Sequence, residues 1–135
     1  MTEEQIRLLV VVGDAVLRDL IRLAFSRSTY GQKGYEVLSA VTLEDVLKIM
    51  VEKKPHGLIV DMLLPQMNGL ELIKEMRSND LIKDVPVIML SSIAYREIVE
   101  QALQAGAADF LIKPFDVDEL IMRVQFALKR AKVIG

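Results

Sequence analysis

Residues 58–69 read Leu-Ile-Val-Asp-Met-Leu-Leu-Pro-Gln-Met-Asn-Gly. A short apolar run ends in Asp61 and is followed by a proline, a turn and the start of a helical pattern. A strand buried inside a parallel sheet reads as a continuous apolar run, and α/β proteins place their chemistry at the carboxyl ends of such strands. Asp61 therefore lies where a reactive carboxylate would lie, although an aspartate that only caps a turn would give the same pattern.

Two later apolar runs also end in polar side chains. Residues 87–90 run into Ser91, and residues 110–112 run into Lys113. The carboxyl ends of parallel strands meet at one edge of the sheet, so an acid, a hydroxyl and an amine would gather there. Such a set could bind or carry a phosphoryl group.

The composition is that of an ordinary globular protein. With 135 residues, 52% of them hydrophobic and 27% charged, we expect a single domain over residues 1–135. A net charge of −2 argues against direct nucleic-acid binding, and the lack of cysteine excludes disulfides and thiolate metal sites. The longest apolar run, residues 8–12, is too short to span a membrane, and the acidic start does not resemble a secretion signal, so we expect a cytoplasmic protein.

Strand-like and helix-like segments alternate along the whole chain. The alternation predicts an α/β fold with a doubly wound five-stranded parallel sheet, right-handed crossovers and helices on both faces. The first helix is indicated by apolar residues that follow one another at helical spacing, namely Leu17, Leu20, Ile21, Ala24 and Phe25. The lone histidine, His56, is interpreted as an exposed turn residue.

Three motifs in this order resemble the receiver domains of two-component response regulators. They are Asp-x-x-Leu-Pro-x-Met-x-Gly at 61–69, Pro-Val-Ile-Met-Leu-Ser at 86–91 and Gly-Ala-Ala-Asp-Phe-Leu-Ile-Lys-Pro-Phe at 106–115. The resemblance implies a flavodoxin-like receiver fold with strand order 2-1-3-4-5. It also implies a cis Lys113–Pro114 bond and a signalling protein rather than an enzyme.

The resemblance assigns roles to the residues at the three strand ends. Asp61 takes the place of the phosphoacceptor, and Ser91 and Lys113 take the places of the groups that contact the phosphoryl oxygens. Phe110 stands where receivers carry an aromatic side chain that rotates with activation, and it could equally be a plain core residue.

The first strand departs from the family pattern. Receivers hold magnesium between the phosphoacceptor, a backbone carbonyl two residues later, here that of Leu63, and an acidic pair at the end of the first strand. Val12 and Gly13 occupy the places of that pair, and we expect both to open onto the cleft beside Asp61. Magnesium binding stays open, because Asp14 could supply a carboxylate or could simply cap the following helix.

Two functions follow from these observations. The favoured one is an atypical receiver, a signalling and protein-interaction module that does not rely on magnesium. The alternative is an orthodox magnesium-dependent receiver, phosphorylated on Asp61 by a histidine kinase or a phosphotransfer protein. A flavodoxin would need a hydroxyl-rich loop at residues 12–14, and a haloacid-dehalogenase-like phosphatase would need an aspartate in place of Leu63.

The resemblance also suggests where partners bind. Receivers often contact a partner or a second copy through the face built by the fourth helix, the fifth strand and the last helix. Candidate residues on that face are Tyr95, Ile98, Phe110 and Met122.

Overall fold

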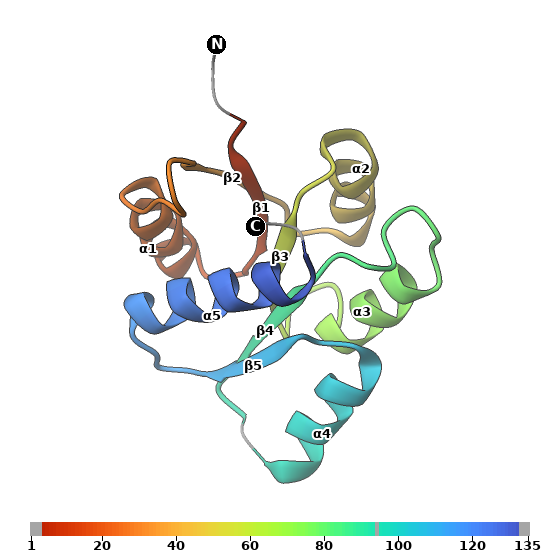
Figure 1. Ribbon diagram of the computed structural model, residues 1–135. Coiled ribbons are helices and arrows are strands. Elements are labelled where there is room, and N and C mark those ends of the chain that lie inside the picture. Colours follow the sequence, from red (N-terminus) through yellow and green to blue (C-terminus); the bar gives the residue numbers. More distant parts are fainter. Residues whose placement is uncertain (1–3, 94, 133–135) are drawn as a thin grey trace.

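The computed structural model describes residues 4–93 and 95–132. Strands and helices alternate strictly within these ranges (Figure 1). Their order is β1 (Ile6–Val11), α1 (Ala15–Ser26), β2 (Tyr35–Ser39), α2 (Leu43–Lys53), β3 (Gly57–Asp61), α3 (Gly69–Arg77), β4 (Val87–Ser91), α4 (Arg96–Ala105), β5 (Asp109–Ile112) and α5 (Val117–Arg130).

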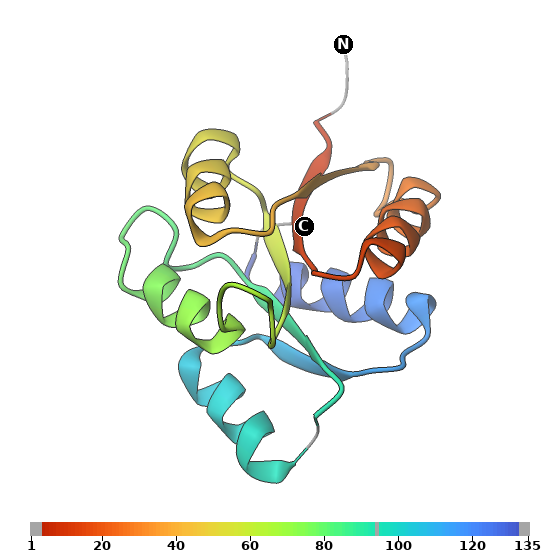
Figure 2. The same cartoon turned by 180° about the vertical axis from the view of Figure 1, so that it is seen from behind.

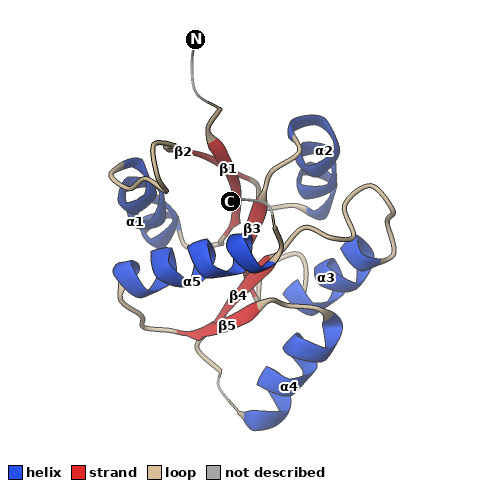
Figure 3. Cartoon of the chain, viewed as in Figure 1, coloured by secondary structure: helices blue, strands red, loops and turns tan. Residues whose placement is uncertain are grey.

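All five strands form one parallel sheet in the order β2-β1-β3-β4-β5, which confirms the predicted fold (Figure 3). The register pairs Val11 with Val60, Asp61 with Leu90, and Ser91 with Ile112. The ends of β1, β3, β4 and β5 are therefore level with one another, and the residues that follow them share one edge of the sheet.

Helices cover both faces of the sheet (Figures 1 and 2). Helices α1 and α5 pack on one face and enclose a buried cluster, here called the α1–α5 core. Helices α2, α3 and α4 pack on the other and enclose the α2–α4 core. Strand side chains alternate between the two, so Val10 and Ile59 belong to the α1–α5 core and Val11 and Val60 to the α2–α4 core.

Local sequence explains where the helices begin and end. The side chains of Asp14, Thr42, Asn68 and Asp116 each accept a backbone N–H at the start of a helix. Helix α4 ends at Gly106, whose φ of 111° favours glycine. The apolar residues of α1 are buried to different extents: Ile21 and Phe25 pack in the α1–α5 core, whereas Leu20 is 50% exposed.

No helix among residues 4–93 and 95–132 has the length and apolar character needed to cross a membrane.

Candidate functional site

Asp61 and Lys113 form a pair at the carboxyl edge of the sheet. Asp61 ends β3 and is only 4% exposed, and Lys113 directly follows β5. The Lys113 Nζ lies 2.5 Å from Asp61 Oδ1, yet Oδ1 accepts no aligned hydrogen bond from any described residue. The contact is therefore an attraction between charges, and the lysine is what makes a buried carboxylate tolerable at this position.

The other carboxylate oxygen faces β1. Gly13 donates its backbone N–H to Asp61 Oδ2 at 3.3 Å, and Arg18 Nη1 donates to the Val12 carbonyl at 3.0 Å. The expectation that Val12 opens onto the cleft is wrong, because its side chain is fully buried in the α1–α5 core. An apolar side chain on this face of β1 is stabilised by burial under the helices, whereas the exposed Gly13 borders the cleft.

Asp14 serves as the N-cap of α1. Its Oδ1 accepts the N–H groups of Val16 and Leu17 at 2.8 and 3.2 Å. Magnesium requires several oxygen ligands in near-octahedral geometry, and among the described residues no three His, Cys, Asp or Glu side chains gather where they could hold a metal ion. With one buried carboxylate, whose Oδ2 already faces an N–H, the donor set does not fit a magnesium site.

Ser91 is buried beside this pair but its hydroxyl faces its own loop. The Ser91 Oγ accepts the N–H of Ile93 at 3.0 Å, and the Ser91 carbonyl accepts the N–H of Lys113 at 2.9 Å. The backbone thus ties Ser91 to Lys113, and the Lys113–Pro114 bond is cis as predicted.

Gly69 is required by the loop that follows Asp61. A Cβ at Gly69 would lie 2.6 Å from the Asp61 carbonyl oxygen and 3.0 Å from Met62 Cα, both of them backbone atoms. The Gly69 N–H donates to the Met62 carbonyl at 2.7 Å, so the start of α3 folds back against the end of β3. The glycine that ends the first motif is therefore explained by a close backbone approach.

The candidate surface residues divide into two groups. Tyr95 and Met122 are 74% and 59% exposed, whereas Ile98 is half-buried and Phe110 lies in the α2–α4 core. Phe110 is thus not a surface residue in this structure, because β5 directs it inward. Three exposed apolar residues of the same face were missed, namely Leu103, Ile112 and Phe126. No sequence signal separated them from core positions of α4, β5 and α5.

His56 lies at the opposite edge of the sheet and is not simply exposed. Its ring Nδ1 accepts the backbone N–H of Arg7 at 2.9 Å, and the backbone N–H of His56 donates to the Arg7 carbonyl at 2.8 Å. Partial burial, and then the charge of Arg7, lower the pKa of His56 below its usual value of 6.5. The interpretation as a solvent-exposed turn residue is wrong, since the ring bridges the starts of β1 and β3.

Comparison with known proteins agrees with this architecture. The family model of the response regulator receiver domain matches residues 8–125. The phosphate regulon transcriptional regulatory protein PhoB of Pseudomonas aeruginosa is 32% identical over 123 residues, which cover 91% of this chain and 52% of that protein. The chain thus spans about half the length of the curated relatives it matches.

Two solved structures extend the comparison. A protein described as a response regulator from Chloroflexus aurantiacus superposes with a TM-score of 0.84 at 32% identity, covering 93% of this chain and 99% of the other. The receiver domain of the Francisella response regulator 1452 gives 0.81 at 28% identity, covering 92% and 97%. The chain belongs to the response regulator receiver domain family and is a receiver domain of two-component signalling.

Proposed function

We propose that this receiver is atypical: a cytoplasmic signalling module that acts through protein contacts, with Asp61 at the phosphoacceptor position and without dependence on magnesium. The observation that carries the proposal is the charge around the Asp61 carboxylate, which among the described residues faces one lysine and has no second acid beside it, since Val12 and Gly13 end the β1 side. Its Oδ1 is buried, accepts no aligned hydrogen bond from the described residues, and is balanced only by the charge of Lys113. Buried acceptors are rarely left in this way without a functional reason.

This arrangement suits a carboxylate that receives a phosphoryl group. A carboxylate oxygen of Asp61 would attack the phosphorus of a phosphohistidine on a kinase or phosphotransfer protein. The new bond joins oxygen to phosphorus while the phosphorus–nitrogen bond breaks and the histidine keeps the electron pair. Lys113 would stay beside the transferred group and offset its negative charge. Ser91 could join after its hydroxyl leaves the Ile93 N–H.

Independence from magnesium follows from the balance of charge around the carboxylate. In the orthodox alternative, two further carboxylates beside Asp61 would repel one another and require a cation. Here Val12 and Gly13 add no charge, and the Lys113 ammonium lies against Asp61 Oδ1. The Asp14 carboxylate is engaged at the start of α1. The site is therefore balanced without an ion.

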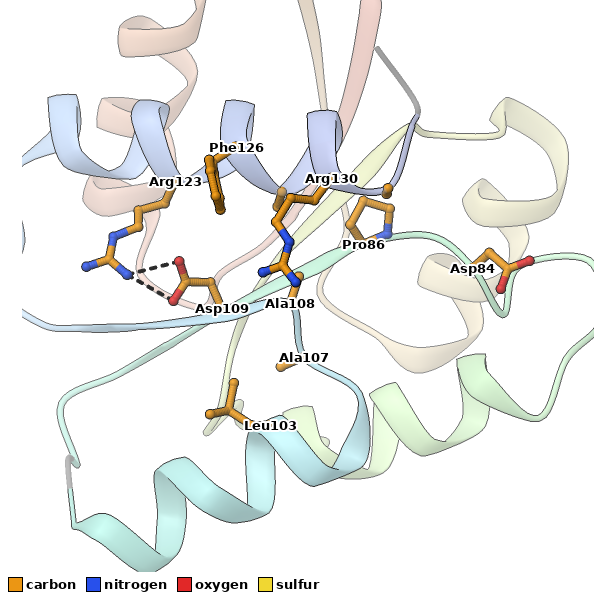
Figure 4. Close-up of a pocket in the computed structure, with 11 residues that line it drawn as sticks. Asp84, Pro86, Leu103, Ala107, Ala108, Asp109, Arg123, Phe126 and Arg130 are labelled. Atoms are coloured by element: carbon orange, nitrogen blue, oxygen red, sulfur yellow. Dashed lines mark hydrogen bonds and ion pairs between the residues drawn. The ribbon is translucent and has the colours of Figure 1, made fainter. Parts of the chain in front are cut away.

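The surface of α4, β5 and α5 is the proposed contact region for a protein partner or a second copy. A groove of about 590 Å³ lies there between α4 and α5 (Figure 4). Leu103, Phe126 and Arg130 line it, together with alanines at the end of α5 and in the turn before β5. On its rim, one Arg123 nitrogen lies 3.0 Å from both carboxylate oxygens of Asp109. An apolar floor with a charged rim is the usual make-up of a protein interface.

Phosphoryl incorporation tests the first part of the proposal. The chain is incubated with acetyl phosphate, once in EDTA and once in millimolar magnesium, and its intact mass is followed over time. We expect the same extent of incorporation in both buffers, whether it is small or undetectable. Rapid incorporation that requires magnesium and disappears in Asp61→Asn would support the orthodox alternative instead.

Surface substitutions test the second part. The double variant Leu103→Ala, Phe126→Ala removes apolar area from the groove, whereas Leu81→Ala removes a comparable exposed side chain from the loop before β4. If the chain self-associates through this face, sedimentation velocity will show weaker association for the double variant only. Equal association in all three proteins would exclude this face as the self-association surface.

A further inference from the structure

The peptide bond between Val12 and Gly13 lies between a cation and the Asp61 carboxylate. Arg18 Nη1 donates to its carbonyl oxygen at 3.0 Å, and its N–H donates to Asp61 Oδ2 at 3.3 Å. In a planar trans peptide the C=O and N–H point in opposite directions, so the guanidinium and the carboxylate lie on opposite sides of one peptide group.

Two elements hold this arrangement in place. Val11 of β1 pairs with Val60 of β3, so the residues that follow them, Val12 and Asp61, lie side by side at the strand ends. Asp14 caps α1, and the Arg18 N–H donates to the Asp14 carbonyl at 2.9 Å in the first turn of that helix. The Arg18 side chain can therefore fold back onto the end of β1.

Hydrogen bonds that share a peptide group polarise one another. A charged donor on the carbonyl oxygen draws electron density from the amide and makes its N–H a stronger donor. The effect of the Arg18 charge is thereby transmitted to Asp61 Oδ2 without direct contact. The positive end of the N–H occupies the side of the carboxylate that faces β1.

We propose that Arg18 is a positioning residue for Asp61 and acts through the Val12–Gly13 peptide. This deepens the proposed function and rests on it, because it explains how the β1 side of the cleft holds the carboxylate without an ion. Arg18 and the Gly13 N–H fix the orientation of Oδ2 and partly offset its charge. Lys113 does the same for Oδ1 from the β5 side.

A double-mutant cycle between Arg18 and Asp61 tests this proposal. Melting temperatures are measured in EDTA for wild type, Arg18→Gln, Asp61→Asn and the double variant. If Arg18 acts on Asp61, its replacement should lower the melting temperature by about 2–4 °C more in the wild-type background than in Asp61→Asn. Arg18→Lys, which keeps the charge and much of the reach, should restore part of the loss.

Arg22 provides the matched control. It lies one turn further along α1 and donates to the Ser39 hydroxyl at 2.6 Å, so Arg22→Gln removes the same charge from the same helix. Its effect on the melting temperature should be the same in both Asp61 backgrounds. If Arg18→Gln also changes the melting temperature equally in both Asp61 backgrounds, the proposal is overturned. Arg18 is then only a tether between helix and strand.

The Gly13 amide proton gives a second readout that survives any loss of stability. Its NMR resonance should move upfield in Arg18→Gln, partly return in Arg18→Lys and stay in place in Arg22→Gln. An unmoved resonance in all three variants would contradict the proposal. Because every sample contains EDTA, a wild-type protein that binds magnesium would refute the proposed function without changing the outcome of this cycle.

Discussion

The two sides of the Asp61 cleft differ in what they offer a phosphoryl group. The side built by β3, β4 and β5 carries an acid, a hydroxyl and an amine, namely Asp61, Ser91 and Lys113. The side built by β1 offers the N–H of Gly13, and the Val12 side chain there is drawn into the α1–α5 core. In the proposed function, the side of β3, β4 and β5 supplies the groups that contact the phosphoryl oxygens. Backbone and apolar packing occupy the β1 side, where the orthodox alternative would place an ion.

Val12 and Asp61 show that the type of residue at a strand end decides whether its side chain joins the core or faces the cleft. Val12 directly follows β1, Asp61 is the last residue of β3, and the two lie side by side, yet one side chain joins the core and the other forms an ion pair. The difference comes from the cost of removing each side chain from water, which is favourable for valine and unfavourable for an unpaired carboxylate.

The largest expected effect comes from restoring acids on the β1 side. The double substitution Val12→Asp, Gly13→Asp should reduce the free energy of unfolding in EDTA by about 3 kcal/mol or more, because it buries a carboxylate in the α1–α5 core and adds like charge beside Asp61. Magnesium should restore part of the loss by binding the folded state, because the new carboxylate at position 13 borders the cleft beside Asp61. Urea unfolding measures both effects, and unchanged stability in EDTA would show that the two sides are equivalent.

An added methyl group should change the free energy of unfolding much more at Gly69 than at Gly13, the two glycines of the cleft. Gly69→Ala places Cβ against the Asp61 carbonyl oxygen and should cost about 2 kcal/mol of unfolding free energy, since backbone must move. Gly13→Ala places Cβ at ordinary contact distance from two side chains, 3.4 Å from the Pro65 ring and 3.9 Å from Leu64, and should be close to neutral. Urea unfolding compares the two, and equal losses would mean that the β1 side is packed as tightly as the β3 side.

The ion pair gives a smaller effect. Lys113→Gln should cost about 1–2 kcal/mol of unfolding free energy, because Asp61 keeps its buried charge without a cation, although partial exposure of the lysine moderates the loss. Adding Asp61→Asn should recover much of it. Lys83→Gln, which breaks an exposed pair with Asp80 at 3.8 Å, is the control and should change little. An equally large effect at Lys83 would contradict a special role for the cleft.

The smallest effect lies away from both sides, at His56. Because the pKa of His56 is lowered in the folded protein, the neutral ring stabilises the fold above the unfolded value of 6.5. That contribution is lost as pH falls below 6.5 towards the lower folded value. Melting temperatures at pH 7.5 and 5.5 should therefore differ more for wild type than for His56→Asn, whose amide oxygen can accept the Arg7 N–H at either pH. Equal pH dependence of the two proteins would show that the pKa of His56 does not differ between the folded and unfolded states.

Much of this architecture could be predicted from the sequence. Apolar runs ending in Asp61, Ser91 and Lys113 are local signals, and parallel strands bring such ends to one edge. The fate of Val12 could not be predicted, because it depends on how α1 and α5 close over β1. The orientation of Phe110 and the contact between His56 and Arg7 likewise depend on neighbours distant in the sequence.

The response of the wild-type protein to magnesium distinguishes a magnesium-independent Asp61 site from a metal-binding one. Thermal melting is followed in EDTA and in magnesium from 1 to about 10 mM, a range in which an ion bound to the folded state would raise the melting temperature. We expect no rise beyond that seen in Asp61→Asn, measured in parallel. A magnesium-dependent rise in wild type that Asp61→Asn abolishes would contradict it and would make Asp61 part of a working metal site.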